Sequence, residues 1–259
     1  MNIDSLRELT YPSISIEIDD AVLILKFGED AYDFLTDLDK RNRYFQMMDA
    51  VENDEDIKVI LTLCEPDSLN EDAYVRFLRR ICGTDIALED IGSSWEFKEN
   101  TDRIKQLRFH RYAIERRVAS KKIIIDGLRG TIVTPFFGET LTADLRYASD
   151  GMCFSLAHKK YGLHPAGALA FFLPKYIGQG RAVELMLTAD YIDAKQAHEL
   201  GLINRILPAV DFESQCIELA KEVSRVSMET LTSTKLLLTS YKKELDNYFE
   251  AEETLIHNW

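Results

Sequence analysis

The sequence predicts an α/β fold in which short strands alternate with helices, and two stretches carry this prediction. Near the start, isoleucines alternate along Ser13–Ile18, Asp19 and Asp20 form a turn, and Val22–Phe27 gives a second apolar run, which is the pattern of a β-hairpin. Much later, Arg181–Pro208 indicates a helix, a turn, a second helix and a strand. With 259 residues, 46% of them hydrophobic, the chain can bury the core of one large domain, or of one domain with a helical appendage.

Helical spacing of apolar residues predicts two helices in the first third of the chain, on either side of a buried strand. The first helix runs from about Asp37 to Glu52, and the β-branched run Lys58–Leu63 follows as the strand. Residues 83–99 form an irregular acidic segment. The apolar faces consist of Tyr44, Met48 and Val51 in the first helix and Tyr74, Phe77, Leu78 and Ile81 in the second.

A basic helix and a strand occupy the middle of the chain. The helix is predicted over Asn100–Ala119, and Arg103–Lys122 holds eight lysines and arginines against one acid, Glu115. One interpretation is a site for the phosphates of a coenzyme A-like ligand. The other, which we favour, is a solvated helix face that pairs with acidic neighbours. Lys122–Asp126 is predicted to be a strand, and Met152–Ser155 a further short one.

Arg181–Pro208 also contains the signals that begin and end its elements. Asp193 is predicted to cap the second helix with Gln196 three residues later, Gly201 ends it, and Leu202–Ile206 follows as a buried strand. Two further helices are expected near the C-terminus. We therefore divide the chain into a core of residues 1–208 and a helical C-terminal region of residues 209–259. The apolar faces consist of Ala182, Leu185 and Met186, then Cys216, Leu219, Ala220 and Val223, and finally Tyr241, Leu245, Tyr248, Glu252 and Leu255.

Charge and composition narrow the classes of partner. A net charge of −13 argues against binding to nucleic acid or to an anionic membrane, since both require clustered cations. The four cysteines are far apart and form no C-x-x-C pair, so we expect reduced thiols and neither a disulfide framework nor a metal site. There is no basic-then-apolar leader and no apolar run of transmembrane length, so we expect a cytoplasmic protein.

Several segments resemble the crotonase (enoyl-CoA hydratase/isomerase) superfamily. Arg181–Pro208 matches the pattern A-x-E-L-x-L-T-G-x-x-I-x-A-x-x-A-x-x-x-G-L-V-N-x-V-x-P, with Ala189 where the family usually has glycine. DLRYAS (Asp144–Ser149) resembles D-I-R-I-A-S, and KKIIIDG resembles K-P-V-I-A-A-V-N-G. The resemblance covers roughly Ile14–Lys235 and implies the ClpP/crotonase fold, a spiral ββα superhelix with a helical C-terminal part, and a homotrimer or hexamer.

The resemblance also implies a reaction through an enolate, which needs oxyanion donors and one or two carboxylates. The family's first donor loop, A-G-A-D, has only Asp72 as a counterpart here. Its triple glycine falls on Thr131–Val133 counted forward from Gly127, or on Thr134–Phe136 counted back from Asp144. In the second case the expected donor is proline, which has no N–H. The family's helix glutamate falls on Pro135 counted forward, or on Gly138 counted back. Glu139 can therefore take the role of this glutamate only if an insertion shifts the register.

The family's second glutamate is replaced by histidine. Phe154–Gly167 aligns without a gap to F-G-Q-P-E-I-L-L-G-T-I-P-G-A-G and places His158 at the glutamate. Imidazole transfers protons near neutral pH. Another acid position of the superfamily falls on Ala166. His158 and His164 are six residues apart, which is not a metal-ligand spacing, so we expect no metal site. We expect structural roles for His164, Tyr161 and His110, and no role for His198.

Two hypotheses about function therefore remain. The first is a lyase- or isomerase-type enzyme that acts on an acyl thioester of coenzyme A or of a carrier protein, with His158 as the main and Glu139 as the secondary proton-transfer residue. Coenzyme A would then be part of the substrate, and no separate cofactor is expected. The second is a catalytically degenerate binding or scaffold protein, because the glycine turn, the donor loop and both glutamates are altered together.

Overall fold

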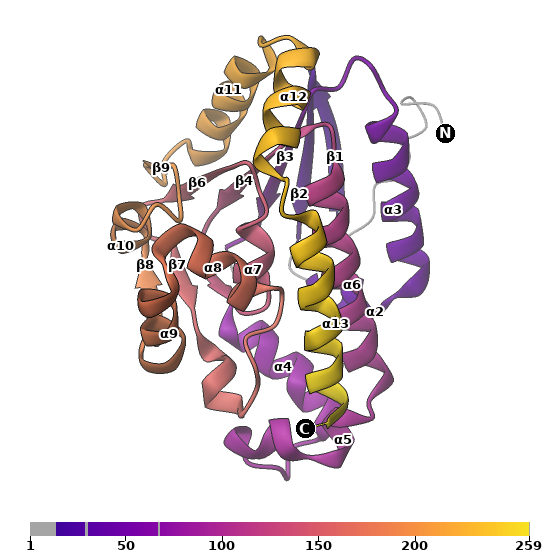
Figure 1. The fold of residues 1–259 in the computed structure, drawn as a ribbon, viewed down its shortest axis with the longest axis vertical. Coiled ribbons are helices and arrows are strands. Elements are labelled where there is room, and N and C mark those ends of the chain that lie inside the picture. The colour runs from indigo at the N-terminus through magenta and orange to yellow at the C-terminus, as the bar shows by residue number, and fades with distance from the viewer. Residues whose placement is uncertain (1–13, 29–30, 67, 259) are drawn as a thin grey trace.

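The structure is a computed structural model that describes residues 14–28, 31–66 and 68–258. Its main sheet has six strands in the order β1-β2-β3-β4-β6-β9. β1 (Ile14–Asp19) pairs antiparallel with β2 (Val22–Phe27), which confirms the predicted hairpin from Ile14 onward, while Ser13 lies outside the described residues. The remaining neighbours pair in parallel (Figure 1). The other strands are β3 (Val59–Cys64), β4 (Ile123–Leu128), β6 (Leu145–Ser149) and β9 (Arg205–Leu207).

A second, smaller sheet is formed by β5 (Thr131–Val133), β7 (Cys153–Ser155) and β8 (Tyr191–Asp193), in the order β5-β7-β8. β5 and β7 are parallel, and β8 pairs antiparallel with β7. β8 occupies the position where the sequence predicts only a turn between two helices. Its three residues are too few for alternation to be visible in the sequence, so pairing with β7 defines the strand.

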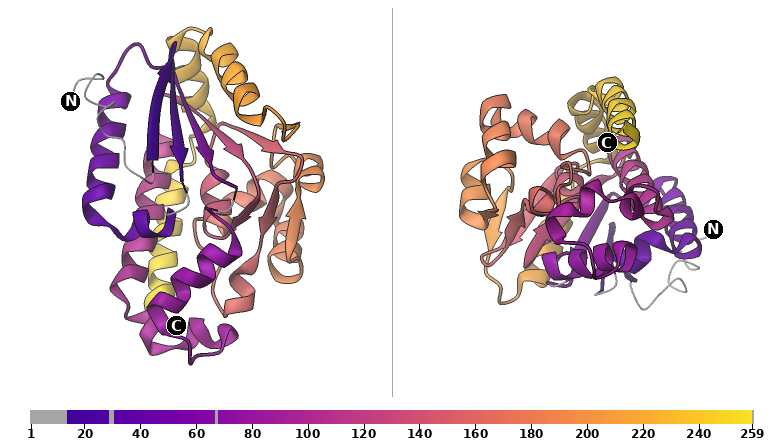
Figure 2. Two further views of the ribbon diagram at one scale, coloured as in Figure 1. Left: turned by 180° about the vertical axis from the view of Figure 1, so that it is seen from behind. Right: turned by 90° about the horizontal axis from the view of Figure 1, so that it is seen from below.

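Alternate residues of the central strands face two different sets of helices. Val22 and Ile24 pack with residues of α11 (Phe212–Ser224) and α12 (Met228–Leu238), whereas Leu23 and Leu25 pack against α3 (Leu38–Glu52). Because successive side chains of a strand point to opposite faces, strands covered on both faces have nearly continuous apolar runs. Figure 2 shows the helices on both sides of the sheet.

The longer helices predicted from the sequence are observed, and helices that were not predicted, such as Leu169–Ile177, lie between them. Asp37 and Asn100 cap α3 and α6 with their side chains, as the residue types predict. Asp193 accepts a hydrogen bond from the N–H of Gln196 at 2.8 Å, which confirms the predicted cap. The segment 83–99 contains only short helices. The other helices are α2 (Ala31–Thr36), α4 (Glu71–Cys82), η1 (Leu88–Ser93), α5 (Trp95–Lys98), α6 (Thr101–Ala119), α7 (Phe136–Thr140), η2 (Ala157–Tyr161), α8 (Leu169–Ile177), α9 (Gln179–Thr188), α10 (Ala194–Glu199) and α13 (Lys242–Asn258).

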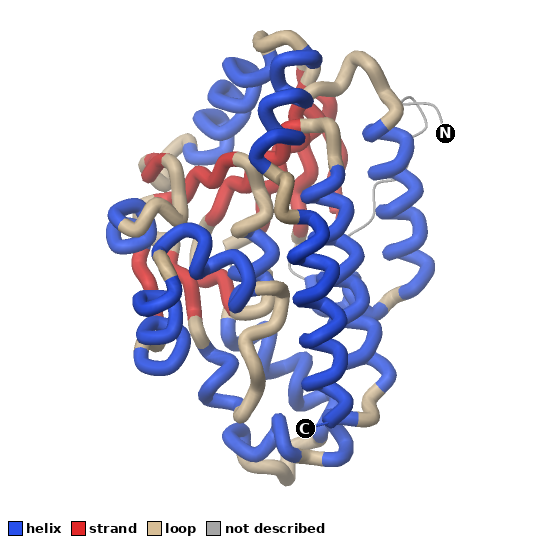
Figure 3. Tube along the Cα trace, viewed as in Figure 1, coloured by secondary structure: helices blue, strands red, loops and turns tan. Residues whose placement is uncertain are grey.

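The two longest helices, α6 and α13, run side by side (Figures 1 and 3). Arg111 of α6 connects them, since its guanidinium lies over the ring of Phe249 and 3.1 Å from the carboxylate of Glu253. Phe249 is buried, but Leu255 is 54% exposed, so the apolar face of α13 extends beyond its packed part. In the described part of the chain, no helix is both long and apolar enough to cross a membrane.

Candidate functional site

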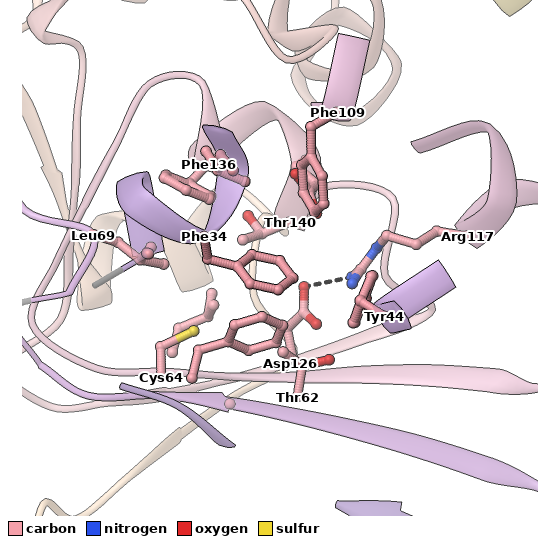
Figure 4. Close-up of a pocket in the computed structure, with 16 residues that line it drawn as sticks. Phe34, Tyr44, Thr62, Cys64, Leu69, Phe109, Arg117, Asp126, Phe136 and Thr140 are labelled. Atoms are coloured by element: carbon pink, nitrogen blue, oxygen red, sulfur yellow. Dashed lines mark hydrogen bonds and ion pairs between the residues drawn. The ribbon is translucent and has the colours of Figure 1, made fainter. Parts of the chain in front are cut away.

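A cavity lies between the main sheet and helices α2, α3, α6 and α7 (Figure 4). About 640 Å³ of its space is free of atoms, and this volume includes open solvent on its outer side. β3 and β4 supply its floor with Thr62, Cys64 and Asp126, which point away from α11. The walls are mostly apolar and include Phe27, Ala31, Phe34, Leu35, Leu69, Leu128, Phe109 and Phe136.

Glu139 lines this cavity and is held by a buried histidine. Its Oε2 lies 2.7 Å from Nδ1 of His110, whose side chain is 2% exposed, while that of Glu139 is 16% exposed. The same face of α6 that packs in the core presents His110 to α7. The contact fixes one carboxylate oxygen, while the carboxylate itself still reaches the cavity. His110 was predicted to be structural; it contacts one of the candidate residues.

A second carboxylate at the cavity, Asp126, is paired with Arg117 of α6. Arg117 Nη2 lies 2.6 Å from Asp126 Oδ2, and its Nε donates to Thr142 Oγ1 at 2.8 Å. Burial raises the pKa of Asp126, and the adjacent guanidinium opposes this rise. Asp126 is 4% exposed, and its Oδ1 has no hydrogen-bond partner among the described residues. Asp126 is therefore a buried carboxyl group, paired with Arg117 through one oxygen and with its other oxygen available.

Two further ionisable groups at the cavity are kept neutral. Burial raises the pKa of the Cys64 thiol and of the Tyr44 hydroxyl, and the nearby carboxylates Asp126 and Glu139 raise both further. The thiolate is the nucleophilic form of cysteine, so Cys64 is not suited to nucleophilic attack at neutral pH. The cavity thus offers carboxylates, and no activated nucleophile among the residues that line it.

The structure shows in which elements the two possible positions of the family's glycine turn lie. Thr131–Val133 is strand β5, Thr134 and Pro135 form the turn that follows it, and α7 begins at Phe136. Gly138 packs with no space for a side chain, because an added Cβ would lie 2.2 Å from the carbonyl oxygen of Gly167. Glu139, one residue later, is the α7 carboxylate that faces the cavity. Asp72, the counterpart of the donor-loop aspartate, is exposed in the first turn of α4.

His158 lies in η2 and is not among the residues that line the cavity with Glu139. It is 4% exposed, it hydrogen-bonds the backbone of Met186, and its Nδ1 has no partner in the described structure. Burial lowers the pKa of His158 to about 4, so its imidazole is uncharged at neutral pH. Its catalytic role stays a prediction. Burial likewise lowers the pKa of His164 to about 3.

The basic helix α6 is mostly paired within the protein. Arg111 pairs with Glu115 and Glu253, and Arg116 with Asp49, as the favoured interpretation of a charged face predicts. Arg117 departs from it, because it points inward to the cavity. The sequence signal for this inner pair is a single aspartate in the isoleucine run of β4, Ile123–Leu128. No group of three or more potential metal ligands occurs in the described residues.

The family model for enoyl-CoA hydratase/isomerase matches residues 96–259, well over half of the chain. Among curated proteins, a 4-chlorobenzoyl coenzyme A dehalogenase from Arthrobacter sp. is 28% identical over 142 residues, 55% of this chain and 51% of the relative. The chain therefore spans about half the length of this relative. A putative enoyl-CoA hydratase of Thermus thermophilus is 24% identical over 219 residues, 82% of this chain and 81% of the relative.

Solved structures of enoyl-CoA hydratases and isomerases share the fold of this chain. An enoyl-CoA hydratase from Bacillus halodurans superposes with a TM-score of 0.73 at 21% identity, covering 94% of each chain. An enoyl-CoA hydratase/isomerase from Cupriavidus metallidurans superposes with a TM-score of 0.69 at 22% identity, covering 95% of this chain and 88% of the other. The fold is thus the predicted crotonase fold, and the chain belongs to the enoyl-CoA hydratase/isomerase family.

Proposed function

We propose that this member of the enoyl-CoA hydratase/isomerase family binds an acyl thioester, of coenzyme A or of a carrier protein, and moves a proton at a carbon beside the thioester carbonyl. The observation that carries the proposal is the Glu139 carboxylate, which faces a largely apolar cavity and is fixed by His110 at 2.7 Å. A carboxylate in such surroundings is positioned to act as a general base or acid. The thioester is the substrate, and the proposal needs no further cofactor.

In the proposed reaction, Glu139 takes a proton from the carbon next to the carbonyl, and the electron pair of the broken C–H bond moves onto the carbonyl oxygen as an enolate. The backbone N–H groups at the start of α7 are the donors that we assign to this oxygen. Hydrogen bonding within this helix begins with the N–H of Glu139, which donates to the carbonyl of Pro135 at 3.2 Å, so earlier N–H groups have no helical acceptor. Return of the proton to the same carbon regenerates the thioester with hydrogen exchange, whereas its delivery to another carbon of an unsaturated acyl group completes an isomerisation.

His158 has a smaller part in this proposal than the sequence alone gives it. A residue that transfers protons must come within hydrogen-bond reach of the reacting atoms. Glu139 lines the cavity and His158 does not, so Glu139 becomes the main proton-transfer residue.

Exchange of the thioester's α-hydrogens in deuterated water, followed by NMR with acetyl-CoA and butanoyl-CoA, tests the proposal. Glu139→Gln should slow exchange by about 10²–10⁴-fold, the usual contribution of a positioned acid or base. Glu253→Gln, which changes an exposed glutamate on α13, is the matched control and should exchange at the wild-type rate. Wild-type protein that binds thioesters but exchanges no hydrogen would contradict the catalytic proposal.

A non-catalytic binding protein is the second candidate. Counted back from Asp144, Pro135 and Phe136 fall where the family has its glycine turn, and proline would remove one potential donor. This candidate is favoured if calorimetry finds neither coenzyme A nor its thioesters bound; partners captured from the source cell would then be sought.

We also infer a homo-oligomer, a trimer or hexamer. Support comes from exposed leucines at the end of α12, where Leu237 is 80% and Leu238 is 73% exposed, since large exposed apolar patches mark interaction surfaces. Sedimentation of wild-type protein and of Leu237→Ser tests this inference; a wild-type monomer at micromolar concentration would contradict it.

A further inference from the structure

The floor of the cavity carries a hydrogen-bonding group that the proposed proton transfer does not use. Asp126 is a buried carboxylate whose Oδ2 is bound by Arg117, while its Oδ1 has no partner in the described part of the chain. Thr62 is its direct neighbour across the sheet. Thr62 and Tyr44, whose side chains carry hydroxyl groups, also line the cavity. Figure 4 shows these three side chains at the end of the cavity where Arg117 enters.

The rest of the lining is of the opposite character. Phe34, Phe109, Phe136 and Leu69 surround the space with apolar surface. A buried oxygen beside an apolar wall is costly when it stays unpaired, because a buried polar group without a hydrogen bond loses its hydration and receives nothing in return. A ligand that fills the apolar space and carries one O–H at the floor would satisfy Asp126 Oδ1 and receive a hydrogen bond from Thr62 or Tyr44.

We infer that the cavity selects acyl groups that carry a hydroxyl beyond the carbons that react, with Asp126 Oδ1 as its acceptor. This inference rests on the proposed function, because it assigns the cavity to the acyl part of a thioester. A neutral hydroxyl fits better than an ammonium group, because Arg117 already supplies the positive charge that Asp126 needs. The hydroxyl proposed here is a substituent already present on the acyl chain, and not one formed at the reacting carbons. The groups that would bind it come from β3, α3 and β4, whereas Glu139 comes from α7.

Calorimetric titration with matched pairs of thioesters tests the inference. Pentanoyl-CoA is compared with 5-hydroxypentanoyl-CoA, and butanoyl-CoA with 4-hydroxybutanoyl-CoA. Wild-type protein should bind at least one hydroxylated member about 10–100-fold more tightly than its partner, the range expected when a buried acceptor gains a hydrogen bond. Asp126→Asn should reduce this preference to a few-fold. Equal binding within both pairs would overturn the inference, since a water molecule would then satisfy Oδ1.

Two further variants keep the result interpretable. Thr62→Val removes one hydroxyl at nearly constant volume, so it tests the same site if Asp126→Asn fails to fold. It should weaken the hydroxylated ligand more than the unsubstituted one. Asp144→Asn breaks another buried ion pair, in which Lys235 Nζ lies 2.8 Å from Asp144, outside this cavity. It should leave the preference unchanged, and loss of the preference in this control would overturn the assignment to Asp126.

Failure of the proposed function is distinguishable from failure of this inference. If wild-type protein binds no thioester, the thioester proposal fails, and the cavity is then probed with methyl pentanoate and methyl 5-hydroxypentanoate, which lack coenzyme A. A preference for the hydroxy ester that Asp126→Asn abolishes would support the hydroxyl site alone. No preference between the two esters would overturn it.

Discussion

Lowering the pH from 8 to 5 is expected to destabilise the protein through His158. This imidazole is 4% exposed, and burial lowers its pKa from the ordinary 6.5 to about 4. Between these two values the unfolded chain binds a proton at His158 and the folded chain does not. The stability associated with neutral His158 is therefore fully present above pH 6.5 and is lost as the pH falls toward 4.

The size of the effect follows from the two pKa values. Each tenfold difference in proton affinity corresponds to about 1.4 kcal/mol, so His158 alone lowers the free energy of unfolding by about 2 kcal/mol at pH 5 and about 3 kcal/mol at pH 4, relative to pH 8. His158→Gln removes the titrating group and keeps a polar side chain. Its cost from altered packing is the same at every pH, so only the pH-dependent part reports the protonation.

The assay is urea denaturation of wild type and His158→Gln at pH 8, 6 and 5. Between pH 8 and 5, wild type should lose about 2 kcal/mol more than the variant. His198→Gln, at an exposed position on α10, is the control and should follow wild type. Parallel curves for wild type and His158→Gln would refute the reasoning, as would an imidazole NMR resonance of His158 that titrates near 6.5.

Three further predictions concern other parts of the fold. Burial raises the pKa of Glu252 to about 7, so the stability associated with its protonated form is lost as the pH rises from about 4.5 through 7. Glu252→Gln should therefore have a free energy of unfolding about 1–3 kcal/mol above that of wild type at pH 8.5 but not at pH 4. An equal difference at both pH values would contradict this. Phe137→Ala should cost about 3–5 kcal/mol in urea denaturation, because this side chain is fully buried and stacked at 3.9 Å on another ring; a cost below about 1 kcal/mol would be inconsistent with that packing. Gly138→Ala should cost about 1–3 kcal/mol, because the new Cβ would meet the carbonyl of Gly167, whereas Gly180→Ala in open space should cost nothing.

Local patterns predicted most helices and strands because each is defined by nearby residues. Alternating isoleucines gave the first hairpin, and Asp37, Asn100 and Asp193 cap their helices through short-range hydrogen bonds. Boundaries shifted where tertiary pairing decides them. The strand predicted at Leu202–Ile206 is observed at Arg205–Leu207, because its limits depend on pairing with Tyr147, Ala148 and Ser149 of β6.

The candidate site was less predictable, because its residues are far apart in the sequence. Glu139 was identified through the resemblance, but counting residues could not fix its register. The structure shows that Gly138 packs against the backbone of Gly167 and that Glu139, the next residue, lines the cavity. His158 was identified by an ungapped alignment, which places a residue in a family pattern but says nothing of how its side chain is buried.

The sequence by itself determined the fold class and the family, because apolar periodicity, capping residues and the Arg181–Pro208 motif are local properties of the chain. Only the tertiary structure decided which polar groups meet in the cavity. Glu139 with His110, and Asp126 with Arg117, join residues of α7 and β4 to one long helix that the sequence predicts as a charged surface. The physical reason is that burial and pairing depend on the packing of distant elements, and these two quantities control the charge and the hydrogen-bonding capacity of a site.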